Sequence, residues 1–187
     1  MKKMIDVFDY SGAFAKHMGR GILLTTKGKT GVNTMTIGWG TIGIEWGRPI
    51  FVAYVRESRY THELLDENPE FTVNCPVGEC DGKILGFCGT KSGRDMDKIK
   101  ELGLTLEEPV CISVPGIKEL PLTLECKVLY RNPQPTDTIP QEILDRYYPE
   151  KDGKRDFHYA YYAEIVSVLV NQRKQSAHHV LTLVCPV

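Results

Sequence analysis

The sequence predicts a mainly β fold, a barrel or a sandwich, with a few short helices on its outside. Seven short runs rich in β-branched, aromatic and other apolar residues are separated by Gly and Pro, which is typical of strands joined by turns. The helical patterns are fewer and shorter. We therefore expect a sheet to form the body of the protein and the helices to cover it.

The predicted strands share this apolar, turn-bounded pattern, and they are residues 21–26, 33–41, 49–55, 71–75, 110–114, 122–130 and 157–170. The second run alternates, so that Met35, Ile37 and Trp39 share one face while the other face carries small or polar residues. Another strand could cover that face, which is the commoner case. A flat aromatic ring could also lie along it, because small residues in a strand allow a ligand to approach the backbone.

The predicted helices are bounded by capping or breaking residues, and they are residues 10–18, 61–67, 81–87, 94–102 and 140–147. The fourth carries the clearest boundary signals. Ser92 to Asp95 fits a capping box, and Gly103 follows the last apolar residue of the pattern. The sequence therefore predicts that this helix begins directly after Ser92.

The length of the chain, 187 residues, fits one domain, with a core at about residues 10–170. Residues 171–187 change to a polar stretch followed by an apolar end. We expect this segment to be an arm that docks on its own barrel or on a partner subunit. Small barrels often leave one face for a second copy to cover, so a homodimer is expected.

Charge and hydropathy exclude several classes of function. There are 23 Lys and Arg residues against 24 Asp and Glu, so no positive surplus is available for nucleic acid or an anionic membrane. No apolar run is long enough for a signal peptide or a membrane span. We therefore expect a cytoplasmic protein, whose six cysteines are reduced thiols.

Two segments combine cations and hydroxyls before a predicted helix. Arg56, Ser58, Arg59, Tyr60 and Thr61 follow an apolar strand, and a helix start adds N–H donors and partial positive charge. A phosphate site and a solvated turn fit this cluster about equally well.

The second segment is Cys88, Gly89, Thr90, Lys91 and Ser92 with the residues to Asp95. It lacks the glycine spacing of a P-loop, so hydrolysis of ATP or GTP is not supported. A Rossmann fold is rejected as well, because Gly19-Arg20-Gly21 lacks the third glycine and precedes a strand.

Metal and nucleophile chemistry find little support. The five histidines show no spacing typical of zinc ligands, so no metal site is predicted. Cys88 has cations nearby in the sequence that could lower its pKa, but a packed, inert thiol is the commoner state. His158 lies in an aromatic stretch, where a hydrogen-bonded structural histidine is the simplest interpretation.

Four features of the sequence, taken in order, resemble the flavin reductase-like FMN-binding split-barrel family. They are the segment Asn33, Thr34, Met35, Thr36 with Trp39, the segment from Arg56 to Thr61, Asn74, and the segment from Cys88 to Asp95. The flavoredoxin branch is the most similar. The resemblance covers about residues 21–170. It implies a Greek-key split β-barrel that dimerises and binds FMN at or near the subunit interface.

The resemblance also implies roles for individual residues. Asn33 to Thr36 would meet the ring edge and ribityl chain, largely through backbone groups. Arg56, Ser58, Arg59 and Thr61 would hold the phosphate, and the loop from Cys88 to Ser92 would close over the flavin, with Lys91 adding charge. His158 would line the pocket of the electron donor.

Three functions fit these residues. The first is an NAD(P)H-dependent FMN reductase, an oxidoreductase in which FMN carries the redox chemistry. The second is an FMN-containing electron carrier that a redox protein reduces and that has no direct activity with NAD(P)H. The third is a non-redox module whose two cationic turns hold another phosphate ligand.

Overall fold

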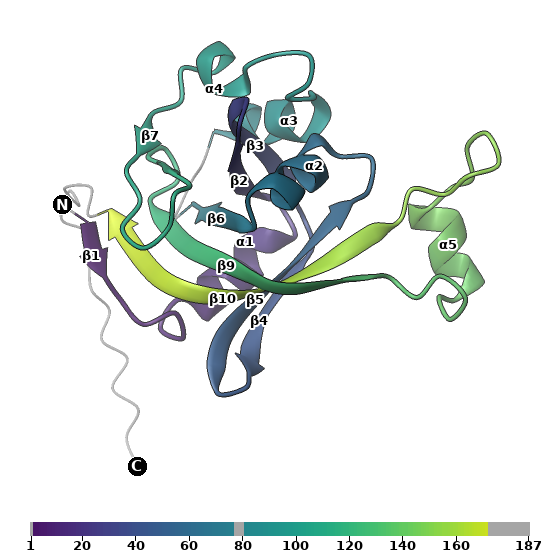
Figure 1. Cartoon of the computed structure of the whole chain (residues 1–187), viewed down its shortest axis with the longest axis horizontal. Helices are drawn as coiled ribbons and strands as arrows, with labels where there is room; N and C mark the ends of the chain where they lie inside the picture. The colour runs from purple at the N-terminus through teal and green to yellow at the C-terminus, as the bar shows by residue number, and fades with distance from the viewer. Residues whose placement is uncertain (1, 77–80, 172–187) are drawn as a thin grey trace.

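A large antiparallel sheet forms the body of the protein. The structure is a computed structural model, and it describes residues 2–76 and 81–171. Its main strands are paired in the order β3, β2, β6, β9, β10, β5, β4, and β1 pairs with the end of β10 (Figure 1). Their bounds are β1 Lys2–Met4, β2 Ile22–Gly28, β3 Gly31–Ile37, β4 Gly40–Glu45, β5 Arg48–Arg56, β6 Glu70–Cys75, β9 Leu122–Pro133 and β10 His158–Asn171.

The sheet curls around one apolar core and stays open between its two edges. Ring packing of Phe51 on Phe71, with centroids 6.3 Å apart, lies inside it, together with inward side chains of β2, β6, β9 and β10. The edge strands β3 and β4 are consecutive in the sequence, yet each pairs with only one main strand. The fold is therefore a split barrel, as the resemblance implies.

Short helices cover the outside of the barrel. They are α1 Ser11–Met18, α2 Tyr60–Glu67, α3 Gly82–Thr90, α4 Lys98–Glu101 and α5 Gln141–Tyr147. Side chains of α3 and α4 pack with Leu23 of β2 in a second apolar cluster, which also includes Ile117 from the small ladder of β7 Leu106–Glu107 and β8 Gly116–Ile117. Figure 1 shows α2, α3 and α4 gathered over one end of the barrel.

Three predicted elements are wrong. The single strand predicted at 33–41 is interrupted, because β3 ends at Ile37 and β4 begins at Gly40. The helix predicted at 94–102 begins only at Lys98, because the Asp97 carboxylate accepts the N–H groups of Ile99 and Lys100 and caps it there. The predicted end holds, since Gly103 has φ +60°. The strand predicted at 110–114 is irregular, because its N–H groups donate to carboxylates: Val110 and Cys111 donate to Glu125 at 2.7 Å.

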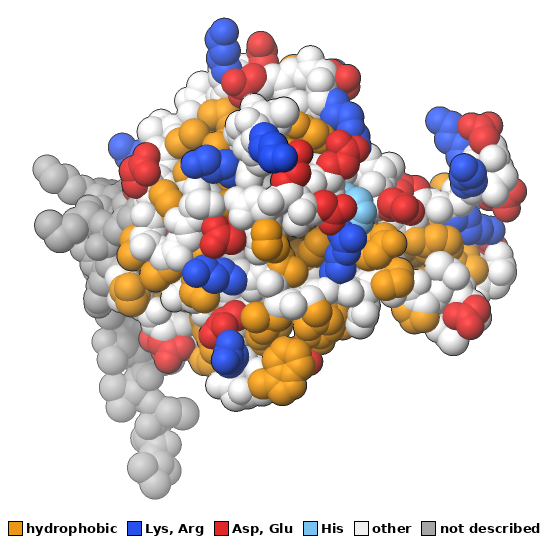
Figure 2. All heavy atoms as spheres, viewed as in Figure 1, with side chains coloured by type: hydrophobic (Ala, Val, Ile, Leu, Met, Phe, Trp, Pro, Cys, Tyr) orange, Lys and Arg blue, Asp and Glu red, His pale blue; other side chains and the backbone are white. Residues whose placement is uncertain are grey.

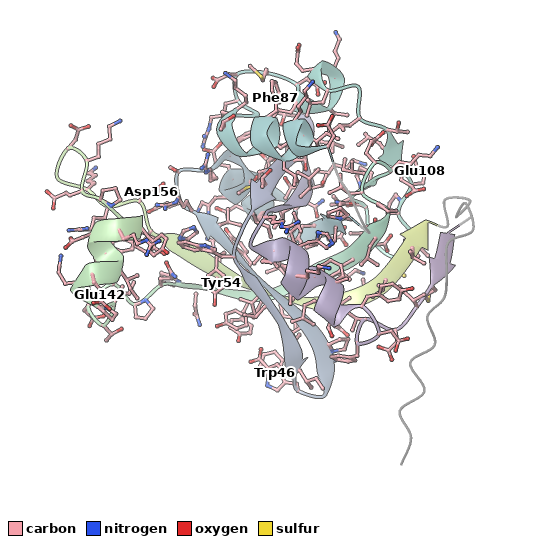
Figure 3. The ribbon with its side chains drawn as sticks, turned by 180° about the vertical axis from the view of Figure 1, so that it is seen from behind. Trp46, Tyr54, Phe87, Glu108, Glu142 and Asp156 are labelled. Carbon is pink, nitrogen blue, oxygen red and sulfur yellow. The ribbon has the colours of Figure 1, made fainter. Side chains whose placement is uncertain are left out.

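The segment between β9 and β10 projects from the barrel. Figure 1 shows α5 and its following turn standing to one side of the body, and Figure 3 shows the same projection from behind, with Glu142 on α5. No residue of α5 is buried. Guanidinium groups hold its C-terminal carbonyls: Arg56 donates to Tyr147 O at 2.8 Å, and Arg155 donates to Leu144 O at 3.2 Å.

The hairpin of β4 and β5 exposes apolar side chains. Ile44 is 70% exposed and Trp46 is 68% exposed. Figure 2 shows apolar side chains gathered over this end of the molecule. Within the described residues, no helix has the length and apolar character that crossing a membrane requires. The predicted C-terminal arm lies outside the described residues, apart from Asn171, which ends β10.

Candidate functional site

Two adjoining cavities lie along the edge strand β3. We call the first, of about 120 Å³, the cationic cavity. We call the second, of about 190 Å³, the aromatic cavity. They share Met35, Thr36 and Arg59 in their walls. The four steps from Asn33 to Ile37 span about 13 Å of extended chain, so the two cavities together form one elongated cleft.

The cationic cavity collects residues from four segments. β3 supplies one wall, the turn into α2 a second, the end of α3 a third, and the loop before α4 the last. The lining residues are Asn33, Met35, Thr36, Ser58, Arg59, Tyr60, Thr61, Cys88, Gly89, Lys91, Ser92, Gly93, Arg94 and Lys98. Most of the predicted site residues therefore come together here, although they are up to 59 positions apart (92 minus 33).

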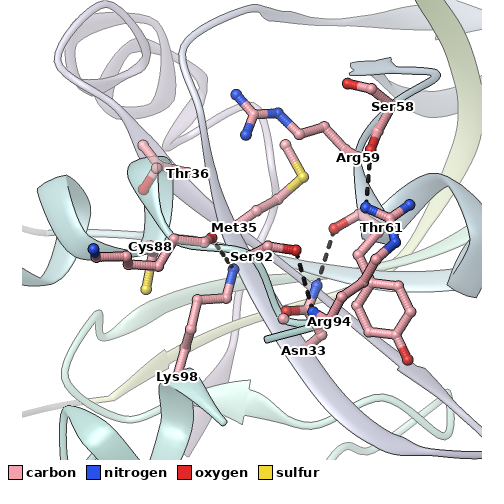
Figure 4. Close-up of a pocket in the computed structure, with 14 residues that line it drawn as sticks. Asn33, Met35, Thr36, Ser58, Arg59, Thr61, Cys88, Ser92, Arg94 and Lys98 are labelled. Atoms are coloured by element: carbon pink, nitrogen blue, oxygen red, sulfur yellow. Dashed lines mark hydrogen bonds between the residues drawn. The ribbon is translucent and has the colours of Figure 1, made fainter. Parts of the chain in front are cut away.

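Arg59 is the exposed cation of this cavity. It precedes α2, and its guanidinium makes no hydrogen bond or ion pair with any residue that the structure describes. Figure 4 shows the side chain extending across the region of Met35. An unpaired guanidinium at the shared wall of two cavities is free to bind a forked anion such as a phosphate.

Lys98 is a buried cation in the same cavity. Its side chain is only 4% exposed, and its Nζ donates to the Lys91 carbonyl at 3.3 Å. No carboxylate lies within ion-pair distance among the described residues. Burial lowers the pKa of Lys98, and the positive charge of Arg59 lowers it further, although Cys88 acts in the opposite direction. A bound anion would offset this cost.

Asn33 leaves a buried polar atom unsatisfied beside these cations. Its Nδ2 donates to Thr61 Oγ1 at 3.1 Å, while its Oδ1 has no partner in the described structure. The Cys88 thiol is buried in another part of the cavity wall, and burial raises its pKa, although Lys98 acts the other way. The thiol is therefore protonated at neutral pH, as expected for a packed cysteine.

The segment from Ser92 to Arg94 closes one side of the cationic cavity. Arg94 donates to the Ser58 carbonyl at 3.0 Å, forms an ion pair with Glu63, and lies 5.4 Å from the centroid of the Tyr60 ring. Three groups at the start of α2 thus hold this segment. Figure 4 shows Arg94 beside Thr61 and Asn33.

The aromatic cavity has a different chemical character. Its wall includes Trp39, Tyr54, Arg56 and His158. The His158 ring lies 4.8 Å from Trp39, and its Nδ1 is 2.9 Å from the Tyr148 hydroxyl. Burial, followed by the positive charge of Arg56, lowers the pKa of His158 to about 4. This histidine is therefore neutral at pH 7.

Three predicted residues point elsewhere. Arg56 donates to the carbonyls of Asp156 at 2.6 Å and Tyr147, so it holds α5 and does not line the cationic cavity. The Thr34 hydroxyl is buried against Thr25 at 3.0 Å, which leaves only its backbone for a ligand. The Thr90 hydroxyl donates to Gly86 O of its own helix at 2.9 Å. Ser58 does line the cationic cavity, but its hydroxyl donates to Asp156 at 2.6 Å.

Lys98 and Tyr54 are site residues that the sequence did not reveal. Lys98 lies within the helix predicted at 94–102, and Tyr54 belongs to an apolar strand. One signal was present for Lys98. It follows Asp97, a strong N-cap residue, and a helix that begins there turns the next side chain back toward the preceding loop.

Comparison with known families decides the assignment. The family model described as flavin reductase like domain matches residues 15–182. The chain belongs to this family. An uncharacterized protein of Archaeoglobus fulgidus is 35% identical over 132 residues, which are 69% of this chain and 73% of that relative.

Solved structures of this flavin reductase-like fold support the architecture. Flavoredoxin from Methanosarcina acetivorans is 25% identical, with a TM-score of 0.61 over 81% of this chain and 68% of that one. An FMN-binding domain of a flavin reductase-like enzyme from Shewanella baltica is 15% identical, with a TM-score of 0.63 over 91% of this chain and 77% of that one. The second likeness concerns the fold alone.

The residues of the cleft suit a flavin that carries a phosphate. At one end lie two cations without carboxylate partners among the described residues, Arg59 and Lys98. At the other end lie aromatic side chains and a neutral histidine. Between them runs β3, whose outer edge pairs with no main strand. These three parts of the cleft match the parts of such a ligand in the same order: an anionic phosphate, an extended chain and a planar ring.

Proposed function

We propose that this protein is an FMN-binding oxidoreductase that passes electrons through bound FMN. The observation that carries the proposal is Arg59, a guanidinium without a hydrogen bond or ion pair to the described residues, which lies where the cationic and aromatic cavities meet. Membership of the flavin reductase-like family supports it, as does the likeness to structures described as flavoredoxin and as an FMN-binding domain.

In this proposal Arg59 and Lys98 bind the phosphate, and Lys91, which lines the same cavity, adds a third positive charge. The outward backbone groups from Asn33 to Thr36 meet the ribityl chain and the edge of the ring. Trp39, Tyr54 and His158 surround the space that remains for the ring and for a second planar molecule.

Bound FMN would supply the redox chemistry, because it accepts a hydride or single electrons. The chain's own part is to bind, to orient and to set the local polarity. Neutral His158, held by Tyr148, keeps one end of the aromatic cavity free of an additional positive charge at pH 7. The buried His158 ring, packed against Trp39, also excludes water from that part of the wall.

The visible absorption spectrum of the purified protein, after addition of FMN and desalting, tests the proposal. A retained flavin spectrum is expected. If no flavin is retained and titration detects no FMN binding, the proposal fails, and a non-redox phosphate-binding module becomes the better description.

The electron donor is a second part of the proposal, and we propose NAD(P)H. The support is the aromatic cavity beside the proposed ring position, which has room for a planar donor. Anaerobic NADH and NADPH should each be added to the FMN-loaded protein. Bleaching of the flavin spectrum is expected with at least one of them. A spectrum that bleaches only with dithionite or with a reduced redox protein would identify an electron carrier instead.

We also propose a homodimer. The exposed side chains of Ile44 and Trp46 on the β4–β5 hairpin support it, because a soluble monomer seldom exposes neighbouring apolar groups to this extent. Light scattering after size-exclusion chromatography should give twice the mass of 21.1 kDa. A mass of one chain at micromolar concentration would contradict the dimer.

A further inference from the structure

The far end of the cationic cavity is closed by direct contact between two segments. A Cβ atom added to Gly93 would lie 2.2 Å from Asn33 Oδ1 and 3.0 Å from the Tyr60 ring. The backbone at Gly93 therefore rests directly on β3 and on the first residue of α2. A side chain at this position would have to displace one of them, since real Cβ atoms do not come so close.

Arg94 fastens this contact. The guanidinium binds the Ser58 carbonyl, the Glu63 carboxylate and the face of the Tyr60 ring, all at the start of α2. Tyr60 is held in turn, because its hydroxyl lies 2.6 Å from Thr30 Oγ1 on the β2–β3 turn. We call Gly93 and Arg94 together the clasp.

The position of the clasp limits what a ligand can carry beyond its phosphate. A flavin whose ring lies in the aromatic cavity runs along β3, and its phosphate reaches Arg59 and Lys98 before it reaches the clasp. FMN ends at that point with a terminal phosphate. FAD continues through a diphosphate to adenosine, and along the line of β3 this continuation meets the contact of Gly93 with Asn33 and Tyr60.

We propose that the clasp makes this site selective for a flavin mononucleotide and against the flavin adenine dinucleotide. The inference rests on the proposed function, because it takes the flavin phosphate to lie in the cationic cavity. Selectivity of this kind comes from a barrier to the wrong ligand and not from an added contact to the right one. Opening the clasp should therefore change the preference between the two flavins more than it changes the affinity for FMN.

The test is the ratio of the dissociation constants of FAD and FMN, measured by isothermal titration calorimetry on the flavin-free full chain. The wild type should bind FMN at least about 30-fold more tightly than FAD, the range that a steric barrier of a few kcal/mol gives. Arg94→Ala should reduce this ratio about tenfold, the effect expected when the charge-assisted contacts of the Arg94 guanidinium are lost.

Two further variants separate closure from charge. Glu63→Gln keeps the Arg94 charge but weakens its hold, and it should reduce the ratio about threefold, because an exposed ion pair contributes little. Gly93→Ala adds a methyl group that pushes the segment away from Asn33 without changing any charge, and it should also reduce the ratio.

Matched controls exist elsewhere in the chain. Arg48→Ala removes the ion pair between Arg48, on the β4–β5 hairpin, and Glu164 of β10. Gly12→Ala adds a methyl group where no atom lies within 4 Å. Both should leave the ratio unchanged.

The outcomes distinguish this inference from the proposed function. If the wild type binds neither flavin, the proposed function itself fails. If it binds FMN but binds FAD equally well, or if the three clasp variants all keep the wild-type ratio, only the clasp inference is overturned. A reduced ratio in Arg94→Ala and Gly93→Ala, with both controls unchanged, supports it even if Glu63→Gln has the smallest effect.

Discussion

The two ends of the cleft differ in whether their basic side chains have hydrogen-bonding or charged partners. At the cationic end, Arg59 and Lys98 have no carboxylate partner among the described residues. At the aromatic end, Arg56 is fully engaged by carbonyls of the projecting segment, and His158 is held neutral. Arg56 and Arg59 belong to the same short segment, so residue type alone does not give an arginine its role. The availability of acceptors decides which of them remains free for a ligand.

The largest expected effect comes from the free guanidinium. Arg59→Ala should weaken FMN binding by about 2–4 kcal/mol, the loss expected when a charge-assisted pair to phosphate is removed. Fluorescence titration of FMN measures it. An unchanged dissociation constant would place the phosphate elsewhere, and the contrast between the two ends would lose its functional meaning.

The aromatic end should show itself through the pH dependence of stability. The pKa of His158 is depressed to about 4 in the folded state, against 6.5 as its ordinary value. The unfolded chain therefore binds the proton first, so stability is present above pH 6.5 and is lost as the pH falls toward 4. Between pH 8 and pH 4.5 the free energy of unfolding should fall by about 2.5 kcal/mol from this group.

Urea unfolding at these two pH values measures the change. His158→Gln, which cannot take up a proton, is the comparison, and its free energy of unfolding should fall by correspondingly less. Equal slopes for the two proteins would show that His158 titrates normally in the folded state.

Lys98 sharpens the description of the cationic end. Lys98→Met should weaken FMN binding by about 1.5 kcal/mol, or roughly tenfold, because the ammonium is one of two unpaired cations there. Because the pKa of Lys98 is lowered from 10.5, the wild-type affinity should also decline as the pH rises toward that ordinary value, and Lys98→Met should lack that decline. Lys100→Met, an exposed lysine on the same helix, is the control and should behave as the wild type.

The smallest effect is expected for the engaged arginine. Arg56→Ala should lower the free energy of unfolding by about 1 kcal/mol, since it removes hydrogen bonds to the carbonyls of Tyr147 and Asp156. It should weaken FMN binding less than Arg59→Ala does. Equal losses of FMN affinity in the two variants would contradict the division between a ligand-binding and a structural arginine.

The sequence predicted the strands that carry the core, because apolar runs such as Ile50–Val55 report burial directly. It also predicted most of the cavity wall, since hydroxyls and cations cluster in two short segments. It did not reveal that Asp156 and the carbonyl of Tyr147 would occupy Arg56, because those partners are about 90 to 100 positions away. Which hydrogen-bond acceptors lie near an arginine is determined by the fold and not by the local segment.

The error at residues 94–102 has a similar origin. Ser92 and Asp97 are both good N-cap residues, and local pattern favours the first because Asp95 completes a capping box. In the fold, Arg94 is drawn to Glu63 and the Ser58 carbonyl on α2, and the Asp95 N–H bonds the Ser92 carbonyl in a turn. The helix therefore starts at the second cap. The local sequence contained both possible N-cap residues, Ser92 and Asp97. The long-range contact of Arg94 that decides between them cannot be seen in it.

The opening between the edges of the barrel has one more consequence. The cleft lies where β3 faces β5 and β10 without pairing to them, so a ligand bound there would bridge parts of the sheet that the chain leaves unjoined. Resistance to unfolding would then depend on the supply of flavin. At a free ligand concentration 100 times the dissociation constant, the added stability is about 2.7 kcal/mol. In a cell, the abundance of this protein would follow cofactor availability through turnover of the flavin-free form.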